Sequence, residues 1–315
     1  MTYIVAGGTG FIGRYLIPRW LSQGKKILVI GRDAQKIHEV FSTRVESLPW
    51  KDVKTQGPEI FSKSDFLLNL AGSNIAQQRW TKNYKEDLLK SRVETTELLS
   101  EICASLGSQS PPFFSADGVG IYGLQENAPT LPPALTEDSP IHFHEHSPFI
   151  SEIGGRWEKA TELAKNHGVP VVNFRLGMVL GKKGGPLQKM QLPFQLGLGG
   201  PVGSGDQPYS WIHIEDVARA LDFMLSHLNH FLGAVNLVSP HCVSQRLFAK
   251  TFGEVLHRPA ILPLPAFVTK ILLGAPMAEE LLLHGQHVYP KRLLEGGFTF
   301  KYADLKEALK EIYGK

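Results

Sequence analysis

Short apolar runs alternate with stretches of helical periodicity in the first half of the chain. Thr2–Ala6 and residues 27–30 are compact β-rich runs, and the second is wholly apolar, as in a strand covered on both faces. Between them, Phe11–Ser22 carries apolar residues at helical spacing, although Pro18 falls inside it. The same patterns predict strands at 66–70, 112–115 and 170–174, a short helix capped by Asp33 that reaches residue 40, and a long helix over 80–106. This alternation predicts an α/β fold built on a Rossmann-type, doubly wound parallel sheet.

The pattern changes in two later segments. Residues 127–148 hold five prolines and predict a long loop, and residues 180–205 are rich in glycine. Beyond them, strands and helices alternate less regularly. We therefore expect a Rossmann domain over residues 1–180, with a segment at about 208–240 returning to the sheet. Residues 181–315 would form a smaller, partly helical C-terminal domain that closes a cleft.

Composition narrows the class of protein. The 315 residues are 43% hydrophobic and 20% charged, and 33 Lys and Arg against 30 Asp and Glu leave +3, too small a surplus to indicate nucleic-acid binding. No apolar run reaches the roughly 18 residues of a membrane helix, and the N-terminus reads as a strand rather than a signal peptide. Cys103 and Cys242 lie far apart and predict neither a disulfide framework nor a zinc site. We expect a soluble, cytoplasmic protein without a membrane partner.

A glycine cluster between the first strand and the first helix carries the strongest functional signal. Residues 4–13 read IVAGGTGFIG, so that the glycines fit both GxGxxG and GxxGxxG. Glycine allows a tight turn, and the N-terminus of the following helix attracts a pyrophosphate. The motif predicts a dinucleotide site contacted by Gly7, Thr9, Gly10, Phe11, Ile12 and Gly13. The alternative is a glycine turn that binds nothing.

The end of the second predicted strand indicates which dinucleotide binds. NAD sites usually place Asp or Glu there to bind the ribose 2′-hydroxyl. Gly31 occupies that position here, and Arg32 follows it. A guanidinium suits a 2′-phosphate, so we expect NADP(H). In the alternative, Arg32 is a surface residue and Asp33 is only a helix cap.

Further motifs resemble a known superfamily over nearly the whole chain. They are NLAG at 69–72, RWT at 79–81, SRVETT at 91–96, FRLGMVLG at 174–181, LPFQLGLGGP at 192–201, SWIHIED at 210–216 and GQHVYPKR at 285–292. Together with the glycine motif, they resemble the extended short-chain dehydrogenases/reductases, in the NAD(P)-dependent epimerase/dehydratase group. Within that group the chain is similar to an atypical subgroup of "epimerase family" proteins that end in a small domain of unknown function.

The resemblance implies additional cofactor-binding residues. Leu70 and Ala71, at the end of the fourth strand, would line the adenine–ribose side, and Leu180 would lie toward the nicotinamide. Asp87 and Arg92, five residues apart on the long helix, would both face the cofactor. For these two, the alternative is an exposed helix face with ordinary charge pairing.

The catalytic pattern of the superfamily is missing. Ordinary members use a serine and a Tyr-x-x-x-Lys pair, in which the lysine lowers the tyrosine pKa. Glu158 matches the glutamate that often follows the lysine by four residues, which puts Ile150 at the tyrosine and Gly154 at the lysine. Asp117 takes the serine position, where the subgroup itself usually has serine.

A few residues are candidates for replacement chemistry. Asp117 and Tyr122, near the end of the fifth strand, are the predicted catalytic pair, with packing as the alternative for Tyr122. His213 could point into the cleft, but a structural histidine is favoured. Arg79 and Trp80 could bind an anionic or planar substrate, with surface and packing roles as the alternative. No metal site is predicted, because the cluster of His142, His144, Glu145 and His146 lies in a proline-rich loop and shows no fourth ligand.

These patterns leave two functions open. The first is an NADP(H)-binding oxidoreductase- or epimerase-like enzyme that acts on an unknown small molecule without the Tyr/Lys pair. The second is a catalytically inactive NADPH-binding sensor or protein-interaction module. The oligomeric state does not follow from the sequence.

Overall fold

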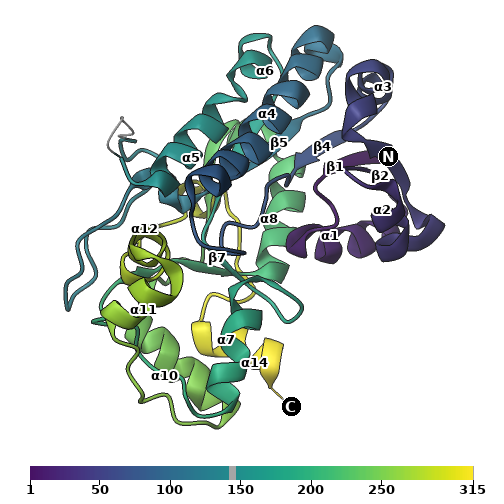
Figure 1. The fold of residues 1–315 in the computed structure, drawn as a ribbon. Helices are drawn as coiled ribbons and strands as arrows, with labels where there is room; N and C mark the ends of the chain where they lie inside the picture. The colour runs from purple at the N-terminus through teal and green to yellow at the C-terminus, as the bar shows by residue number, and fades with distance from the viewer. Residues whose placement is uncertain (142–146, 315) are drawn as a thin grey trace.

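A seven-stranded parallel sheet lies at the centre of the N-terminal part of the protein (Figure 1). The computed structural model describes residues 1–141 and 147–314. The strand order is β3 (Glu46–Pro49), β2 (Lys26–Gly31), β1 (Thr2–Ala6), β4 (Phe66–Asn69), β5 (Phe113–Gly118), β6 (Val171–Leu176) and β10 (Gly233–Leu237). All neighbouring strands pair in parallel. The order reverses between β1 and β4, the point at which doubly wound sheets bind ligands. The predicted fold class is confirmed.

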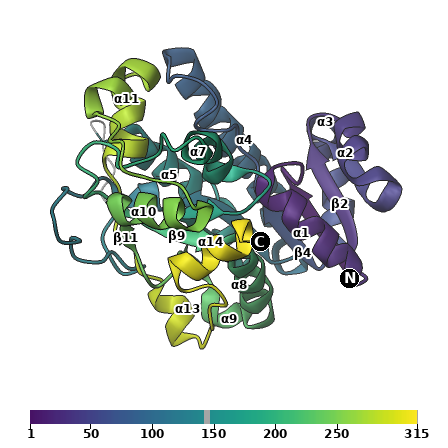
Figure 2. The same cartoon turned by 90° about the horizontal axis from the view of Figure 1, so that it is seen from below.

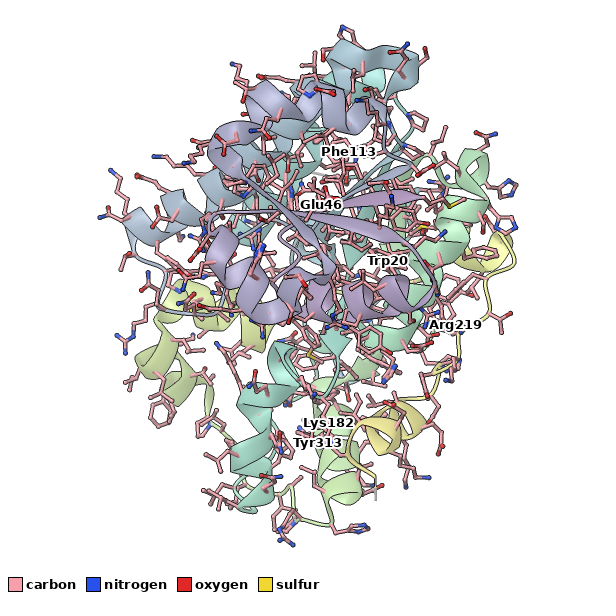
Figure 3. All side chains as sticks on the ribbon, turned by 90° about the vertical axis from the view of Figure 1, so that its right-hand side faces the viewer. Trp20, Glu46, Phe113, Lys182, Arg219 and Tyr313 are labelled. Carbon is pink, nitrogen blue, oxygen red and sulfur yellow. The ribbon has the colours of Figure 1, made fainter. Side chains whose placement is uncertain are left out.

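Helices cover both faces of this sheet. One face carries α1 (Phe11–Ser22), α2 (Ala34–Phe41) and α8 (Ile214–Ser226), and the other carries α3 (Trp50–Ser62), α4 (Lys82–Leu106) and α6 (Glu162–Asn166). Trp20 belongs to the first core and Phe113 to the second, on opposite sides of the strands (Figure 3). Burial on both faces is why the strands contain so few polar residues.

Local sequence explains where several helices begin. Asp33 Oδ1 accepts hydrogen bonds from the backbone N–H of Gln35 and Lys36, as predicted for a cap of α2. Thr81 caps α4 through the N–H of Tyr84, so the helix starts at Lys82 and not at residue 80. The sequence analysis missed β3 and α3, because this segment contains a helix-breaking Gly57–Pro58 pair and shows little apolar periodicity.

The residues from Met178 onward, apart from α8, α9 (Leu228–Phe231) and β10, are called the C-terminal region here. They build a separate core next to the sheet (Figure 2). Two small sheets form there, β7 (Met178–Leu180) with β9 (Trp211–His213), and β8 (Pro208–Tyr209) with β11 (Val243–Ser244). Within residues 208–240, β10 pairs with β6 in the main sheet and α8 packs on one of its faces, whereas β8 and β9 pair outside it. The remaining helices are α5 (Phe149–Lys159), α7 (Gly185–Gln195), α10 (Gln245–Leu256), α11 (Ala266–Leu273), α12 (Ala275–Ala278), α13 (Lys291–Glu295), α14 (Leu305–Tyr313) and the short helices η1 (Ser42–Arg44), η2 (Gly107–Gln109), η3 (Val119–Tyr122) and η4 (Glu279–Leu283).

The proline-rich stretch between η3 and α5 runs along the C-terminal region. The N–H of Gln125 donates to the Gly285 carbonyl, and the N–H of Leu135 donates to the His287 carbonyl. The histidine-rich cluster considered above for a metal, His142, His144, Glu145 and His146, lies outside the described residues. In residues 1–141 and 147–314, no helix combines the length and the apolar character needed to cross a membrane.

Candidate functional site

The glycine turn brings the ends of β1 and β4 together. Gly7 has a φ of +74°, which favours glycine, and its N–H donates to the Ile30 carbonyl at 3.0 Å. A Cβ at Gly7 would lie 2.7 Å from the Leu70 carbonyl oxygen and 2.8 Å from the Ala71 nitrogen. Gly7, Leu70 and Ala71, predicted separately, therefore lie side by side at the topological switch point.

The same turn leaves the N-terminus of α1 open. A Cβ at Gly13 would lie only 2.2 Å from the Gly8 carbonyl oxygen, so the first helical turn packs directly on the loop backbone. Gly10 is the N-cap and supplies no side-chain hydrogen bond, and the first turn holds no acidic residue. The backbone N–H groups of Phe11, Ile12 and Gly13 are the donors that a helix leaves unpaired at this end. This geometry suits a phosphate.

The Phe11 side chain packs on the connection between β7 and α7. A Cβ at Gly184 would lie 2.5 Å from the Phe11 ring, and one at Gly185 would lie 2.8 Å from it. The C-terminal region therefore reaches the glycine turn. Leu180, at the end of β7, is completely buried, and its side chain belongs to the core of that region.

Arg32 lies exposed at the end of β2. In the part of the chain that the structure describes, its guanidinium has no hydrogen-bond or ion-pair partner. The neighbouring Asp33 accepts two hydrogen bonds from the first turn of α2, and among the described residues it forms no ion pair with Arg32. Gly31 has no side chain, so the space next to the end of β2 stays open. A Cβ at Gly31 would meet only the Ile37 side chain, whose Cδ1 would lie 3.1 Å away.

Arg92 is buried and supports the loop that follows β4. Its guanidinium donates to the carbonyls of Ser73 at 2.9 Å and Leu88 at 3.1 Å, and lies 5.1 Å from the Trp157 ring centroid. Burial lowers its pKa to about 10, so it stays charged at neutral pH. Asp87 is exposed. Five residues of an α-helix span about 140° around its axis, so the two side chains leave α4 in different directions, Asp87 toward solvent and Arg92 toward the interior. The alternative of an exposed helix face is wrong for Arg92.

Asp117 is a buried carboxyl group with one unpaired oxygen. Its side chain is 3% exposed, and Oδ1 accepts the N–H of Gly118 at 2.7 Å. Oδ2 has no hydrogen-bond partner among the described residues. Arg175 lies opposite on β6, but its guanidinium binds both oxygens of Glu158 at 3.0 Å. Burial, and then repulsion by Glu158, raise the pKa of Asp117 well above its usual value, although Arg175 and Arg92 oppose this.

Tyr122 belongs to a network across the ends of β5, β6 and β10. Its hydroxyl donates to Asn236 Oδ1 at 2.8 Å and accepts from Arg175 Nη1 at 2.7 Å. Burial raises the pKa of this phenol. The hydroxyl is held by two protein partners, which favours the packing alternative for Tyr122 over a catalytic role. The sequence analysis assigned no role to Arg175, although it lies in the FRLGMVLG motif at 174–181, or to Asn236, since no local pattern indicates the partner of either side chain.

Apolar contacts fill the positions of the missing Tyr/Lys pair. A Cβ at Gly154 would lie 2.8 Å from Ile121 Cβ, and one at Gly120 would lie 3.1 Å from Ile150 Cβ. Helix α5 therefore packs directly on η3. The N–H of Ile150 donates to Glu280 Oε2 at 2.9 Å, so a carboxylate of the C-terminal region caps α5 at the former tyrosine position.

The other candidates have structural partners. His213 Nδ1 accepts the N–H of Glu215 at the start of α8, and Nε2 lies 2.9 Å from Glu311 Oε2. Arg79 donates to the carbonyls of Ile271 and Leu272, which ties the β4–α4 loop to α11. Trp80 donates to the Ile75 carbonyl at 2.8 Å. The structural role favoured for His213 is consistent with these contacts.

The parallel sheet, the glycine turn at its switch point and the open end of α1 define a Rossmann protein of the dinucleotide-binding class. Residues 3–237 match the family described as NAD dependent epimerase/dehydratase, and residues 264–312 match a domain of unknown function, DUF1731. The chain belongs to the NAD dependent epimerase/dehydratase family. The resemblance to this family inferred from the sequence motifs is confirmed.

Individual relatives align with the whole chain. The human epimerase family protein SDR39U1 is 35% identical over 314 residues and covers 99% of both chains. YfhF of Bacillus subtilis, also called an epimerase family protein, is 32% identical over 99% of this chain and 98% of its own. A crystal structure of human SDR39U1 (isoform 2) with NADPH superposes with a TM-score of 0.86 at 36% identity, over 99% of each chain. A nucleoside-diphosphate sugar epimerase from Corynebacterium glutamicum has a TM-score of 0.74 and 26% identity, over 100% of this chain and 58% of that one.

Proposed function

We propose that this protein binds NADP(H) and acts as an oxidoreductase- or epimerase-like enzyme on a small molecule. The observation that carries the proposal is the open N-terminus of α1, next to Leu70 and Ala71 and on the same edge of the sheet as the unpaired Arg32. The human SDR39U1 structure contains NADPH, which supports the same cofactor here.

The residues present fit this cofactor. The backbone of Gly7, Thr9, Gly10 and the first turn of α1 would hold the pyrophosphate, because glycine lets the main chain approach it closely. Gly31 and Arg32 would hold the 2′-phosphate, and Leu70 and Ala71 the adenine–ribose side. We expect Asp87 to reach the cofactor from the exposed side of α4. Arg92 would not contact the cofactor itself. It would hold the loop that begins at Ala71 in place through its hydrogen bond to the Ser73 carbonyl.

Replacing Arg32 with alanine tests the cofactor assignment. A hydrogen bond to a charged group contributes about 1.5–3 kcal/mol, so Arg32→Ala is expected to weaken NADPH binding by about 10- to 150-fold. NADH lacks the 2′-phosphate, and its affinity is expected to stay within about twofold. Both affinities can be measured by isothermal titration calorimetry. Lys36→Ala, another exposed cation nearby in sequence, is the control and should change neither. Equal losses for NADPH and NADH would refute the assignment.

Asp117 is the proposed acid. The nicotinamide, when bound, supplies or accepts a hydride. When a carbonyl carbon is reduced, its oxygen must gain a proton, and the raised pKa of Asp117 keeps one available on a buried carboxyl. The unpaired Oδ2 makes Asp117 the better of the two predicted catalytic residues, because the Tyr122 hydroxyl is already bound on both sides.

The buried Asp117 also predicts a pH-dependent change in stability. In the native state its pKa is raised, so above about pH 4 this carboxyl holds its proton more in the folded protein than in the unfolded chain, and its contribution to the free energy of unfolding falls as pH rises. Asp117→Asn removes this titration. The difference in free energy of unfolding, variant minus wild type, is expected to increase from pH 4 to pH 8 by about 1 kcal/mol or more. Urea unfolding at several pH values measures it, with Asp52→Asn, a half-exposed carboxylate on α3, as the control. A pH-independent difference would show that Asp117 is ionised in the fold.

The inactive sensor remains the second candidate. It is favoured by the tight contact of Gly154 with Ile121, which leaves no room for the ordinary lysine. A screen of carbonyl compounds and nucleotide sugars for NADPH turnover separates the two functions. Turnover that is lost in Asp117→Asn supports the enzyme. A cofactor-loaded protein that turns over none of them, but changes its affinity for a protein partner with NADPH, supports the sensor.

The remaining expectations follow from this proposal. Residues 1–180, with the segment around 208–240, would bind the cofactor, and residues 181–315 would bind the substrate, which we propose is a small molecule rather than nucleic acid. Cys103 and Cys242 are free thiols, which supports a cytoplasmic location.

A further inference from the structure

Large apolar side chains are exposed together on one part of the C-terminal region. Nine of them, between 36% and 77% exposed, form what we call the apolar ridge: Leu192, Leu196, Leu198, Ile261, Leu262, Leu264, Phe267, Ile271 and Leu272. Surface leucines usually occur singly, and a contiguous exposed apolar group marks an interaction site. The ridge lies outside the glycine turn and outside the Asp117 network.

Backbone contacts join two segments of the ridge, and α11 follows the second of them directly in sequence. The N–H of Leu262 donates to the Gly199 carbonyl, and the N–H of Leu264 donates to the Pro201 carbonyl, so the two segments run side by side. Arg258 Nε also donates to the Gln195 carbonyl at the end of α7. Helix α11 begins one residue after Pro265. Figures 1 and 2 show α7, α10 and α11 grouped together, away from α2 and α3.

The two segments that carry the ridge contain basic residues and no acidic ones. No acidic residue occurs between Glu162 and Asp206, or between Glu254 and Glu279. A cavity of about 380 Å³ adjoins the ridge at Ile261 and is lined by Lys250, His257 and Arg258. Glu254 also lines it, but its carboxylate is bound by Lys306 at 3.0 Å. Lys270, within the ridge, is paired with Glu279 at 2.6 Å.

Contrary to the expectation from the sequence that no membrane partner exists, we propose that the apolar ridge and its basic cavity dock on the surface of an anionic lipid bilayer. Projecting apolar side chains flanked by cations are the combination that binds such surfaces, through burial in the interface and attraction to anionic headgroups. A second copy of this chain would bring like charges together at the cavity. The ridge residues come from α7 and the residues just after it, from the loop before α11 and from α11 itself, so they form an uneven surface. A bilayer can deform to fit such a surface.

Vesicle co-sedimentation of the full chain tests this proposal. The probes are vesicles of phosphatidylcholine alone and vesicles with 40% phosphatidylglycerol. At low salt, wild type is expected to bind the anionic vesicles at least tenfold more tightly, and 0.5 M salt should weaken binding. Phe267→Asp/Ile271→Asp and Lys250→Glu/Arg258→Glu should each lose at least tenfold. The matched controls are Leu163→Asp/Leu232→Asp, which are exposed apolar residues elsewhere, and Lys51→Glu/Lys54→Glu on α3.

The other outcomes overturn the proposal. They are no binding of wild type to anionic vesicles, equal losses in the control variants, or binding that neither ridge nor cavity variants change. Self-association that disappears with the ridge variants, in the absence of vesicle binding, would assign the ridge to a second copy instead. Capture of an acidic protein without vesicle binding would assign it to a protein partner. Unchanged melting temperatures and NADPH affinities confirm that the variants are folded.

Discussion

Restoring the ordinary catalytic pair by Ile150→Tyr/Gly154→Lys is expected to destabilise the protein by more than about 3 kcal/mol, without adding activity. The reason is steric, because even a Cβ at position 154 would lie 2.8 Å from Ile121 Cβ and 3.0 Å from Ile121 Cα. A lysine there would also bury an ammonium group, which is costly without a partner. Urea unfolding at neutral pH gives the change in free energy.

The single change Gly154→Ala shows whether packing or helix propensity dominates the free energy of unfolding at this position. Glycine inside a helix normally costs about 1 kcal/mol relative to alanine, so Gly154→Ala would stabilise an open helix. The close contact with Ile121 predicts instead that Gly154→Ala lowers the free energy of unfolding. Arg156→Lys, exposed on the same helix, is the control and should change stability by no more than about 0.5 kcal/mol. A wild-type unfolding midpoint for the double variant would mean that α5 and η3 separate easily.

Gly13→Ala is expected to abolish tight NADPH binding, with a loss of more than about 100-fold, and to lower stability by about 3 kcal/mol. Its Cβ would lie 2.2 Å from the Gly8 carbonyl oxygen, a backbone atom that can move only if α1 moves away from the glycine turn. That movement takes the helix N-terminus away from the phosphate. Titration with NADPH well below the melting temperature measures the affinity of the folded variant.

Ser22→Ala is the matched control for this prediction. Ser22 is exposed at the other end of α1, and its hydroxyl bonds only the Arg19 carbonyl among the described residues. Its replacement should leave both stability and affinity close to wild type. If Gly13→Ala binds NADPH as wild type does, the pyrophosphate does not lie at this helix end, and the proposed cofactor site fails with it.

The sequence determined the class of fold and the type of cofactor that the glycine turn and the end of β2 are suited to bind. Thr2–Ala6, the glycine turn and Phe11–Ser22 were predictable because a strand, a tight turn and a helix N-terminus depend on neighbouring residues. The same holds for Asp33, whose cap of α2 uses atoms two and three residues away. The missing Tyr/Lys pair was evident only through the resemblance to the superfamily, in which Glu158 aligns Ile150 and Gly154 with the two catalytic positions.

Only the tertiary structure decided what the charged side chains do. Arg92 turned out to be buried against Trp157, the Tyr122 hydroxyl is held by Arg175 and Asn236, and Asp117 keeps an unpaired oxygen because Arg175 binds Glu158 instead. Arg175 lies 53 residues and Asn236 lies 114 residues from Tyr122 in the sequence, so no local sequence pattern indicates these contacts. A turn or a cap is set by contacts within a few residues. Burial and its effect on a pKa depend on which distant strands and helices the fold packs around the group.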